Sequence, residues 1–161
     1  MSKDKGRYIW AALRIGVGWL LLWPFLDKLF GLGFATAPED AWIAGGSPTF
    51  GYLKFATSGP FAPLFQSLAG NPVVDWLFML GLLFVGLALL LGIGVNIAGY
   101  SGAMMMLFLW LSRLPPENNP VLDEHIVYMI VLIGLARVKA GQWFGLGKWW
   151  SQLVKDYPFL Q

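Results

Sequence analysis

Three consecutive ionisable residues, Asp123, Glu124 and His125, stand at the start of a long apolar run. His125 is the only histidine of the chain, and a histidine beside a carboxylate can exchange protons near neutral pH. We therefore take this trio as the catalytic candidate, suited to a quinone that gains or loses protons at a membrane surface. The alternative is a local role, because acidic side chains near a helix N-terminus also complement the helix dipole.

Other polar and aromatic residues lie inside or beside the apolar runs. Arg14 lies well inside the first run, where an arginine is costly unless it is paired or reaches the headgroups. We expect a structural or ligand-pairing role for it. Lys28 and Arg113 have the charge to attract an anionic donor or to stabilise a reduced quinone. The candidates for substrate binding are Asp27, Lys28, Trp42, Arg113 and Tyr128.

The residue types exclude several chemistries. Without cysteine the chain has no disulfides, thiolate nucleophiles or iron–sulfur clusters, and one histidine cannot supply bis-histidine haem or three-histidine zinc ligation. The run Met104–Met106 does not predict a copper site, because consecutive helical residues point to different faces. We expect neither metal nor haem, and the sequence shows no catalytic serine motif, phosphate-binding loop or nucleic-acid signature.

The composition is that of a membrane protein. Hydrophobic residues make up 57% of the 161-residue chain and charged residues only 12%, too few to give each helix the polar face that a soluble domain needs. The predicted fold is one all-α domain over 1–161, a polytopic membrane protein with a four-transmembrane-helix antiparallel bundle. Each span needs roughly 20 apolar residues, and the expected spans are 8–30, 74–95, 97–114 and 121–138.

Basic residues set the expected orientation. They gather before the first run and after the last one, and the positive-inside rule then places both termini in the cytoplasm of a multi-pass plasma-membrane protein. These residues are Lys3, Lys5, Arg7, Arg137, Lys139, Lys148 and Lys155. The first run with Ala35–Ala37 also resembles a cleaved signal peptide, but it is too long and is interrupted by charged residues, so we favour a retained span.

The segment 31–73 is long for a loop and rich in aromatic residues, glycine and proline. We expect an outer cover with short interfacial helices near "FGYLKFA" and "FAPLFQSL", broken by prolines. This cover either packs at the membrane surface without a ligand or closes a slot for an amphiphile. Residues 139–161 are expected to form an amphipathic cytoplasmic tail.

In an antiparallel bundle, the ends of the predicted helices meet at one surface. The sequence thus predicts a single outer cluster of polar residues above an apolar interior. Adjacent helical residues lie about 100° apart, so we expect that Asp123, Glu124 and His125 do not all point one way. The expected cluster contains Asp27, Lys28, Asp75, Arg113, Asp123, Glu124 and His125.

Five segments resemble the DoxX/DoxD family of small bacterial membrane proteins, in particular its actinobacterial type. They are "LRIGVGWLLLWPFLDKLFGLGF", "GGSPTFGYL", "SGPFAPLF", "DWLFMLGLLFVGLALLLGIG" and "NNPVLDEHIVYMIVLIGLARVKAGQWFGLGKWW". The resemblance implies a four-helix transmembrane domain related to the DoxD subunit of thiosulfate:quinone oxidoreductase, which works with a DoxA partner. The family pattern covers Arg14, Gly18, Lys28, Asn119, Pro120, Asp123 and His125. No segment here resembles DoxA, so that partner would be a separate polypeptide.

The sequence therefore leads to a functional hypothesis with two alternatives. The hypothesis is the membrane subunit of a quinone-linked oxidoreductase, with thiosulfate as one candidate donor and a quinone as the bound amphiphile. The first alternative is a non-catalytic scaffold that anchors a soluble redox enzyme. The second is a small-solute transporter, less favoured because no inverted repeat is visible. The expected partners are the lipid bilayer, a DoxA-like or other redox subunit, and a second copy of the chain; no nucleic acid is expected.

Overall fold

The computed structural model describes residues 3–117 and 119–160, and these residues are helical with no β-strand among them. Four long helices dominate: α1 (Lys3–Phe30), α3 (Pro72–Leu91), α4 (Val95–Leu111) and α5 (Glu124–Arg137). The shorter helices are η1 (Pro38–Asp40), η2 (Trp42–Ala44), η3 (Tyr52–Ala56), α2 (Ala62–Ser67), η4 (Ala140–Gln142), α6 (Gly147–Leu153) and η5 (Pro158–Leu160). Helices η3 and α2 fall on the two segments of the outer loop where the sequence predicts short helices.

Local capping residues explain where the long helices begin and end. Asn71 caps α3 by accepting a hydrogen bond from the backbone N–H of Val73 at 2.9 Å, and Pro72 occupies the first turn. Helix α3 ends at Gly92, which adopts a left-handed conformation with φ 75°. The predicted start of the last helix at 121 is wrong, because Asn119 closes a turn by accepting from the backbone N–H groups of residues 121 and 122.

Two of the long helices have the length and apolar character to cross a membrane. They are residues Gly6–Phe30 of α1 and the whole of α3, of 25 and 20 residues. Helix α4 has 17 residues and α5 has 14, so α5 rises only about 21 Å against a hydrocarbon thickness of about 30 Å. Helix length alone therefore supports two spans and falls short for α5.

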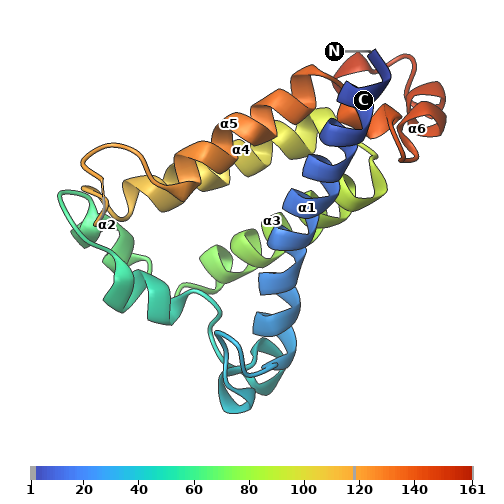
Figure 1. Cartoon of the computed structure of the whole chain (residues 1–161). Helices are drawn as coiled ribbons and strands as arrows, with labels where there is room; N and C mark the ends of the chain where they lie inside the picture. The colour runs from blue at the N-terminus through green and yellow to red at the C-terminus, as the bar shows by residue number, and fades with distance from the viewer. Residues whose placement is uncertain (1–2, 118, 161) are drawn as a thin grey trace.

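The helices pack in pairs. Helices α4 and α5 run side by side, α1 crosses α3, and α3 joins the pairs by packing on α4 (Figure 1). The crossing of α1 and α3 depends on small residues: a Cβ atom at Gly86 would lie 2.9 Å from the backbone nitrogen of Leu22, and one at Gly18 would lie 2.9 Å from the backbone nitrogen of Leu90. Only glycine permits this backbone approach.

The pairs converge at one end of the molecule and separate toward the other. At the first end, called the terminal end below, α1 begins, α3 and α5 end, and α6 packs nearby (Figure 1). From there α1 diverges from the α4–α5 pair, so the end of α1 and the end of α4 lie apart (Figure 1). A closed bundle whose polar helix ends all meet, as the sequence predicts, is therefore not what the described residues form.

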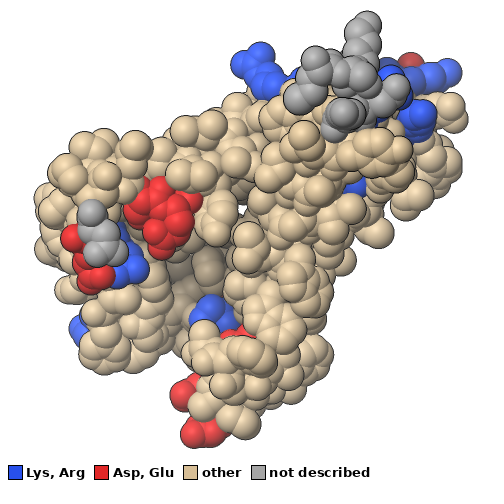
Figure 2. Space-filling model, in the orientation of Figure 1, with Lys and Arg blue, Asp and Glu red and all other residues tan. Residues whose placement is uncertain are grey.

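Large apolar side chains cover much of the exterior. On α4, Ile97, Tyr100, Met104 and Phe108 form an exposed stripe at helical spacing. On the side of the molecule shown in Figure 2, a broad band is uncharged and most charged side chains are gathered toward the ends, with a hollow between the part formed by α1 and the part formed by α4 and α5. Met104 is exposed while Met106 is buried, which confirms that these methionines face different ways.

Candidate functional site

Asp123 and His125 form a close pair at the start of α5. One carboxylate oxygen of Asp123 accepts hydrogen bonds from the backbone N–H groups of His125 at 3.0 Å and Ile126 at 3.3 Å, which caps the helix. The other oxygen lies 2.8 Å from His125 Nδ1. The two side chains are only 14% and 15% exposed. A single carboxylate therefore starts the helix and holds the imidazole, shielded from most of the solvent.

A pocket of about 110 Å³ lies next to this pair. It is lined by Arg113, Pro116, Glu117, Asn119, Leu122, Asp123 and Glu124. The Arg113 guanidinium lies 3.6 Å from the Glu117 carboxylate, so three carboxylates surround one partly neutralised cation. This charge pattern suits a neutral hydrogen-bonding group or a cation better than an anion.

The expectation that Asp123, Glu124 and His125 do not point one way is wrong. Each offers one ligand atom, and these atoms lie within 4.8 Å of one another. The reason is that Asp123 precedes the helix, with extended dihedrals of φ −133° and ψ −175°, so the 100° spacing of helical residues does not apply to it. Among the described residues this trio is spaced to hold a cation.

Tyr52 joins the site from the outer loop. Its hydroxyl lies 2.8 Å from the Ser112 Oγ, and the buried Ser112 hydroxyl donates to the Leu109 carbonyl at 2.6 Å. Burial raises the pKa of Tyr52, and the charges of Asp123 and Glu124 add to this, while the Ser112 hydrogen bond and Arg113 act in the opposite direction. Tyr52 therefore lies within electrostatic reach of the acidic trio.

Sequence reasoning placed Tyr52 in the outer cover but did not make it a site residue. Sixty residues separate it from Ser112, and the contact depends on how the loop returns to α4. The backbone N–H of Ser58 fixes that return by donating to the Ser112 carbonyl at 2.9 Å. The available signal was a hydroxyl-bearing aromatic residue among the apolar residues of "FGYLKFA".

The other members of the expected cluster lie elsewhere. Asp27 is buried and accepts from the backbone N–H groups of Phe34 at 3.2 Å and Ala35 at 3.0 Å, which fixes the turn after α1. Lys28 is half-buried on that same end of α1. Since the end of α1 lies apart from the ends of α4 and α5 (Figure 1), Asp27 and Lys28 are separate from the trio.

Asp75 also has a local task. Its buried carboxylate accepts from the Ser47 hydroxyl at 3.0 Å, the Thr49 backbone N–H at 3.1 Å and the Thr49 hydroxyl at 2.5 Å. These bonds fold the outer loop onto the start of α3. The single outer cluster predicted from the sequence is thus divided into the Asp27 turn, the Asp75 loop contact and the trio with Arg113.

The two aromatic candidates contribute packing. Trp42 packs edge-to-face on Trp76 with ring centroids 4.6 Å apart. Tyr128 is half-buried against the apolar core, one turn beyond the trio. Neither residue lines the pocket next to Asp123.

Arg14 of α1 links the end of α3 to the C-terminal segment through hydrogen bonds at the terminal end. Its side chain is fully buried and donates to the carbonyls of Leu89 and Leu90, at the end of α3. It also donates to Trp143 at 3.2 Å and Phe144 at 2.9 Å. The guanidinium thus pairs with backbone carbonyls in the interior.

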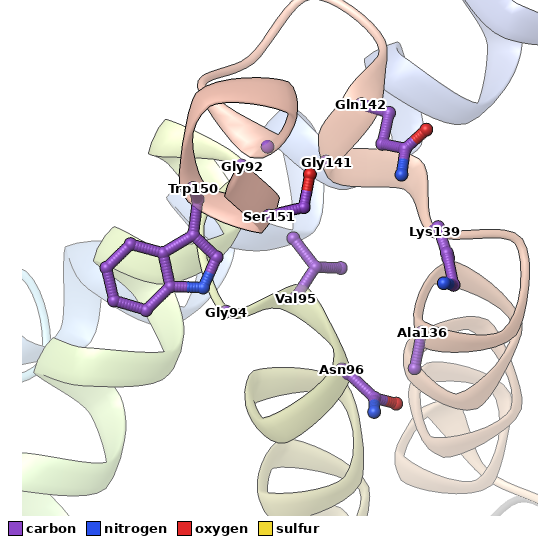
Figure 3. A pocket seen from close by; sticks show the side chains of 11 residues that line it. Gly92, Gly94, Val95, Asn96, Ala136, Lys139, Gly141, Gln142, Trp150 and Ser151 are labelled. Atoms are coloured by element: carbon purple, nitrogen blue, oxygen red, sulfur yellow. The ribbon is translucent and has the colours of Figure 1, made fainter. Parts of the chain in front are cut away.

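A second pocket lies beside the turn between α3 and α4. Its volume is about 20 Å³, enough for roughly one water molecule. Figure 3 shows its wall: Gly92 and Gly94 of that turn face the C-terminal residues Gly141, Trp150 and Ser151. This pocket is too small for an amphiphile. It lies at the interface between the C-terminal segment and the turn that joins α3 to α4.

Comparison with known proteins adds no relative to this picture. No protein-family model matches the chain, and neither a characterised protein nor a solved structure matches it.

Proposed function

We propose that this protein is a multi-pass membrane protein that binds a quinone-like amphiphile and serves as the membrane subunit of a quinone-linked oxidoreductase. The carrying observation is the shielded Asp123–His125 pair, with 2.8 Å between its carboxylate and imidazole, beside a pocket at the end of two apolar helices. The motifs that resemble DoxX/DoxD proteins support the same proposal.

The exterior supports placement in a bilayer. The apolar stripe on α4 and the uncharged band on the surface would face lipid (Figure 2). In the proposed four-span arrangement, α4 and α5 cross as a pair, and the residues that flank α5 complete its short span. Both termini and the basic terminal end face the cytoplasm, while the acidic trio faces outward.

The chemistry follows from the pair. Reduction of a quinone to a quinol takes up two electrons and two protons. An ionised Asp123 can only accept a hydrogen bond, so Nδ1 of His125 donates to it. A proton taken from water onto Nε2 gives the imidazolium, which passes that proton to one quinone oxygen and returns to the neutral form. The second quinone oxygen takes its proton from water, and a separate redox subunit supplies both electrons. Tyr52 and Glu124 supply further hydrogen-bonding groups, and the quinone tail follows the hollow between the helix pairs (Figure 2).

The electrons come from a separate redox subunit. The chain has no cysteine to hold an iron–sulfur cluster, and its single histidine cannot supply bis-histidine haem ligation. Thiosulfate as the donor has weaker support than the quinone, because three carboxylates line the pocket beside Arg113 and Lys28 lies at the separate end of α1. A DoxA-like partner would have to provide the anion site.

A non-catalytic scaffold remains the second candidate, and pocket size favours it. The pocket of about 110 Å³ is smaller than the roughly 150 Å³ cavity that holds one benzene. A quinone ring would therefore need part of the wider hollow as well. A scaffold would use the same polar end as a docking surface for a soluble redox enzyme.

The test is a binding titration with the reconstituted protein. A short-chain ubiquinone is added to protein in phosphatidylcholine nanodiscs, and tryptophan quenching is followed to saturation. Asp123→Asn is the decisive variant, because asparagine is as good a helix cap as aspartate but removes the charge beside the imidazole. We expect saturable binding in the wild type that weakens in Asp123→Asn and in His125→Gln.

Ser151→Ala, at the opposite end of the molecule, is the matched control and should bind as the wild type does. Quenching that rises without saturation in the wild type, or saturable quenching unchanged in Asp123→Asn and His125→Gln, would remove the quinone site and leave the scaffold.

A further inference from the structure

The C-terminal segment, residues 139–160, is folded back onto the terminal end of the molecule. The backbone N–H of Leu146 donates to the Leu91 carbonyl at 2.9 Å, and the Asn96 side chain donates to the Phe159 carbonyl at 3.5 Å. The Trp150 indole closes the segment on itself by donating to the Leu160 carbonyl at 2.6 Å. Backbone groups thus form many of the hydrogen bonds that hold the segment in place, and many of its side chains face outward.

The outward side chains are large and apolar. Trp149 is 55% exposed and Leu153 is 60% exposed, and their spacing of four residues on α6 puts them on one face. Tryptophan and tyrosine favour the boundary between headgroups and hydrocarbon, where a ring can be half in each phase. The exposed members of this segment, called the aromatic face below, are Phe144, Leu146, Trp149, Leu153, Tyr157 and Phe159.

Position along the molecule agrees with a membrane boundary. The Phe144 ring packs on Tyr8, near the start of α1, with centroids 5.0 Å apart. The backbone N–H of Leu146 donates a hydrogen bond to the carbonyl of Leu91, the last residue of α3. The first two residues of the aromatic face therefore lie at the ends of the two helices that are long enough to cross a membrane.

The charge of the segment selects the lipid. Lys148 and Lys155 are exposed within the segment, and Arg137 and Lys139 lie at its start. The acidic side chain of the segment is Asp156, so the basic residues outnumber the acidic ones. Figure 2 shows basic side chains gathered at this end. Basic groups next to an aromatic boundary attract anionic headgroups, each contributing about 1 kcal/mol near the surface, which is about a fivefold preference.

We propose that the segment 139–160 lies on the bilayer surface with the aromatic face inserted at the headgroup boundary, where Lys148 and Lys155 bind anionic phospholipid headgroups. The segment is then a lipid-recognition surface, and its binding to headgroups fixes how deeply the terminal end lies in the bilayer. This role is independent of quinone binding at the opposite end of the molecule.

The experiment uses the full chain reconstituted in phosphatidylcholine that contains increasing fractions of brominated phosphatidylglycerol, whose bromine atoms quench nearby tryptophan. The difference between the wild type and Trp149→Phe gives the quenching of Trp149 alone. Brominated phosphatidylcholine is the reference lipid. We expect phosphatidylglycerol to be enriched several-fold beside Trp149 at low salt, and the enrichment to fall in 1 M salt, where the Debye length is about 3 Å.

Matched lysine variants decide the assignment. Lys148→Gln and Lys155→Gln should each reduce the enrichment by up to about fivefold, while Lys54→Gln, an exposed lysine of η3, should leave it unchanged. Equal quenching of Trp149 by the two brominated lipids overturns the headgroup preference. Failure of both lipids to quench Trp149 overturns the proposal. The inference rests on the proposed placement of α1 and α3 in the bilayer, but because no quinone is present, neither result depends on quinone binding.

Discussion

The buried guanidinium of Arg14 should be the most sensitive polar contact of the terminal end. Arg14→Met keeps the length of the side chain but leaves four carbonyl groups, those of Leu89, Leu90, Trp143 and Phe144, without their donor. A hydrogen bond to a charged group contributes about 1.5–3 kcal/mol, and the removed charge no longer has to be desolvated, so we expect a net loss of about 3 kcal/mol in the free energy of unfolding.

The loss should have a local signature. Without the guanidinium, the hydrogen bond from Leu146 to the Leu91 carbonyl remains, but the bridge between the end of α3 and residues 143–144 is lost, so trypsin should cut sooner after Lys139 and Lys148. Arg14→Lys should be intermediate, because an ammonium donates from one point and lacks the planar fork that spans two chain segments. Both effects are measurable on purified protein: unfolding by SDS in dodecylmaltoside micelles, followed by tryptophan fluorescence, and the rate of limited proteolysis.

Arg137→Met is the matched control, since Arg137 is an exposed arginine at the end of α5. It should change the free energy of unfolding by less than about 0.5 kcal/mol, as surface substitutions usually do. If Arg14→Met unfolds within about 1 kcal/mol of the wild type, or if both lysine sites stay equally protected, the guanidinium is not the tie that the contacts indicate.

Two further substitutions probe the helix crossing and the outer site. Gly86→Ala should lower the free energy of unfolding by about 1–3 kcal/mol, because its Cβ would lie 2.9 Å from the backbone of Leu22. Gly16→Ala is the control, and it should be neutral or slightly stabilising because the space around Gly16 is open. Equal effects of the two substitutions in the same SDS titration would refute the close crossing. Burial raises the pKa of Tyr52 above its ordinary value of 10.0, so its stabilising contribution is complete below that pH and is lost as the pH rises through the folded-state pKa. Tyr52→Phe should therefore flatten the loss of stability above pH 10.0, and an unchanged alkaline slope would show that Tyr52 is not buried.

The sequence predicted the fold at the level of elements. Apolar runs flanked by glycine, proline and asparagine gave the four long helices to within a few residues, and the two short helices of the outer cover lie where prolines bound them. The last helix was placed three residues too early, because Asn119 and Pro120 resemble a helix cap but close a separate turn.

The arrangement of the site was less predictable. The Asp123–His125 contact is local and could be expected from adjacent residue types. The partners of Asp27 and Asp75 are backbone and hydroxyl groups of loops. The spacing of apolar residues predicts helices but does not predict which loop will pack on a given carboxylate. Likewise, the separation of the helix pairs depends on which glycines meet at a crossing, and Gly18, Gly86 and Gly92 look alike in the sequence.

The partners of Arg14 also impose an order on biosynthesis. The residue lies in α1, which leaves the ribosome before its acceptors do: they follow 75 residues later at Leu89 and 129 residues later at Trp143. At about 5–20 residues per second, the arginine waits roughly 4–15 s for the first carbonyl and about 6–26 s for the last. During that interval the nascent helix carries an uncompensated cation, which water or headgroups inside the insertion machinery must solvate until the later segments arrive.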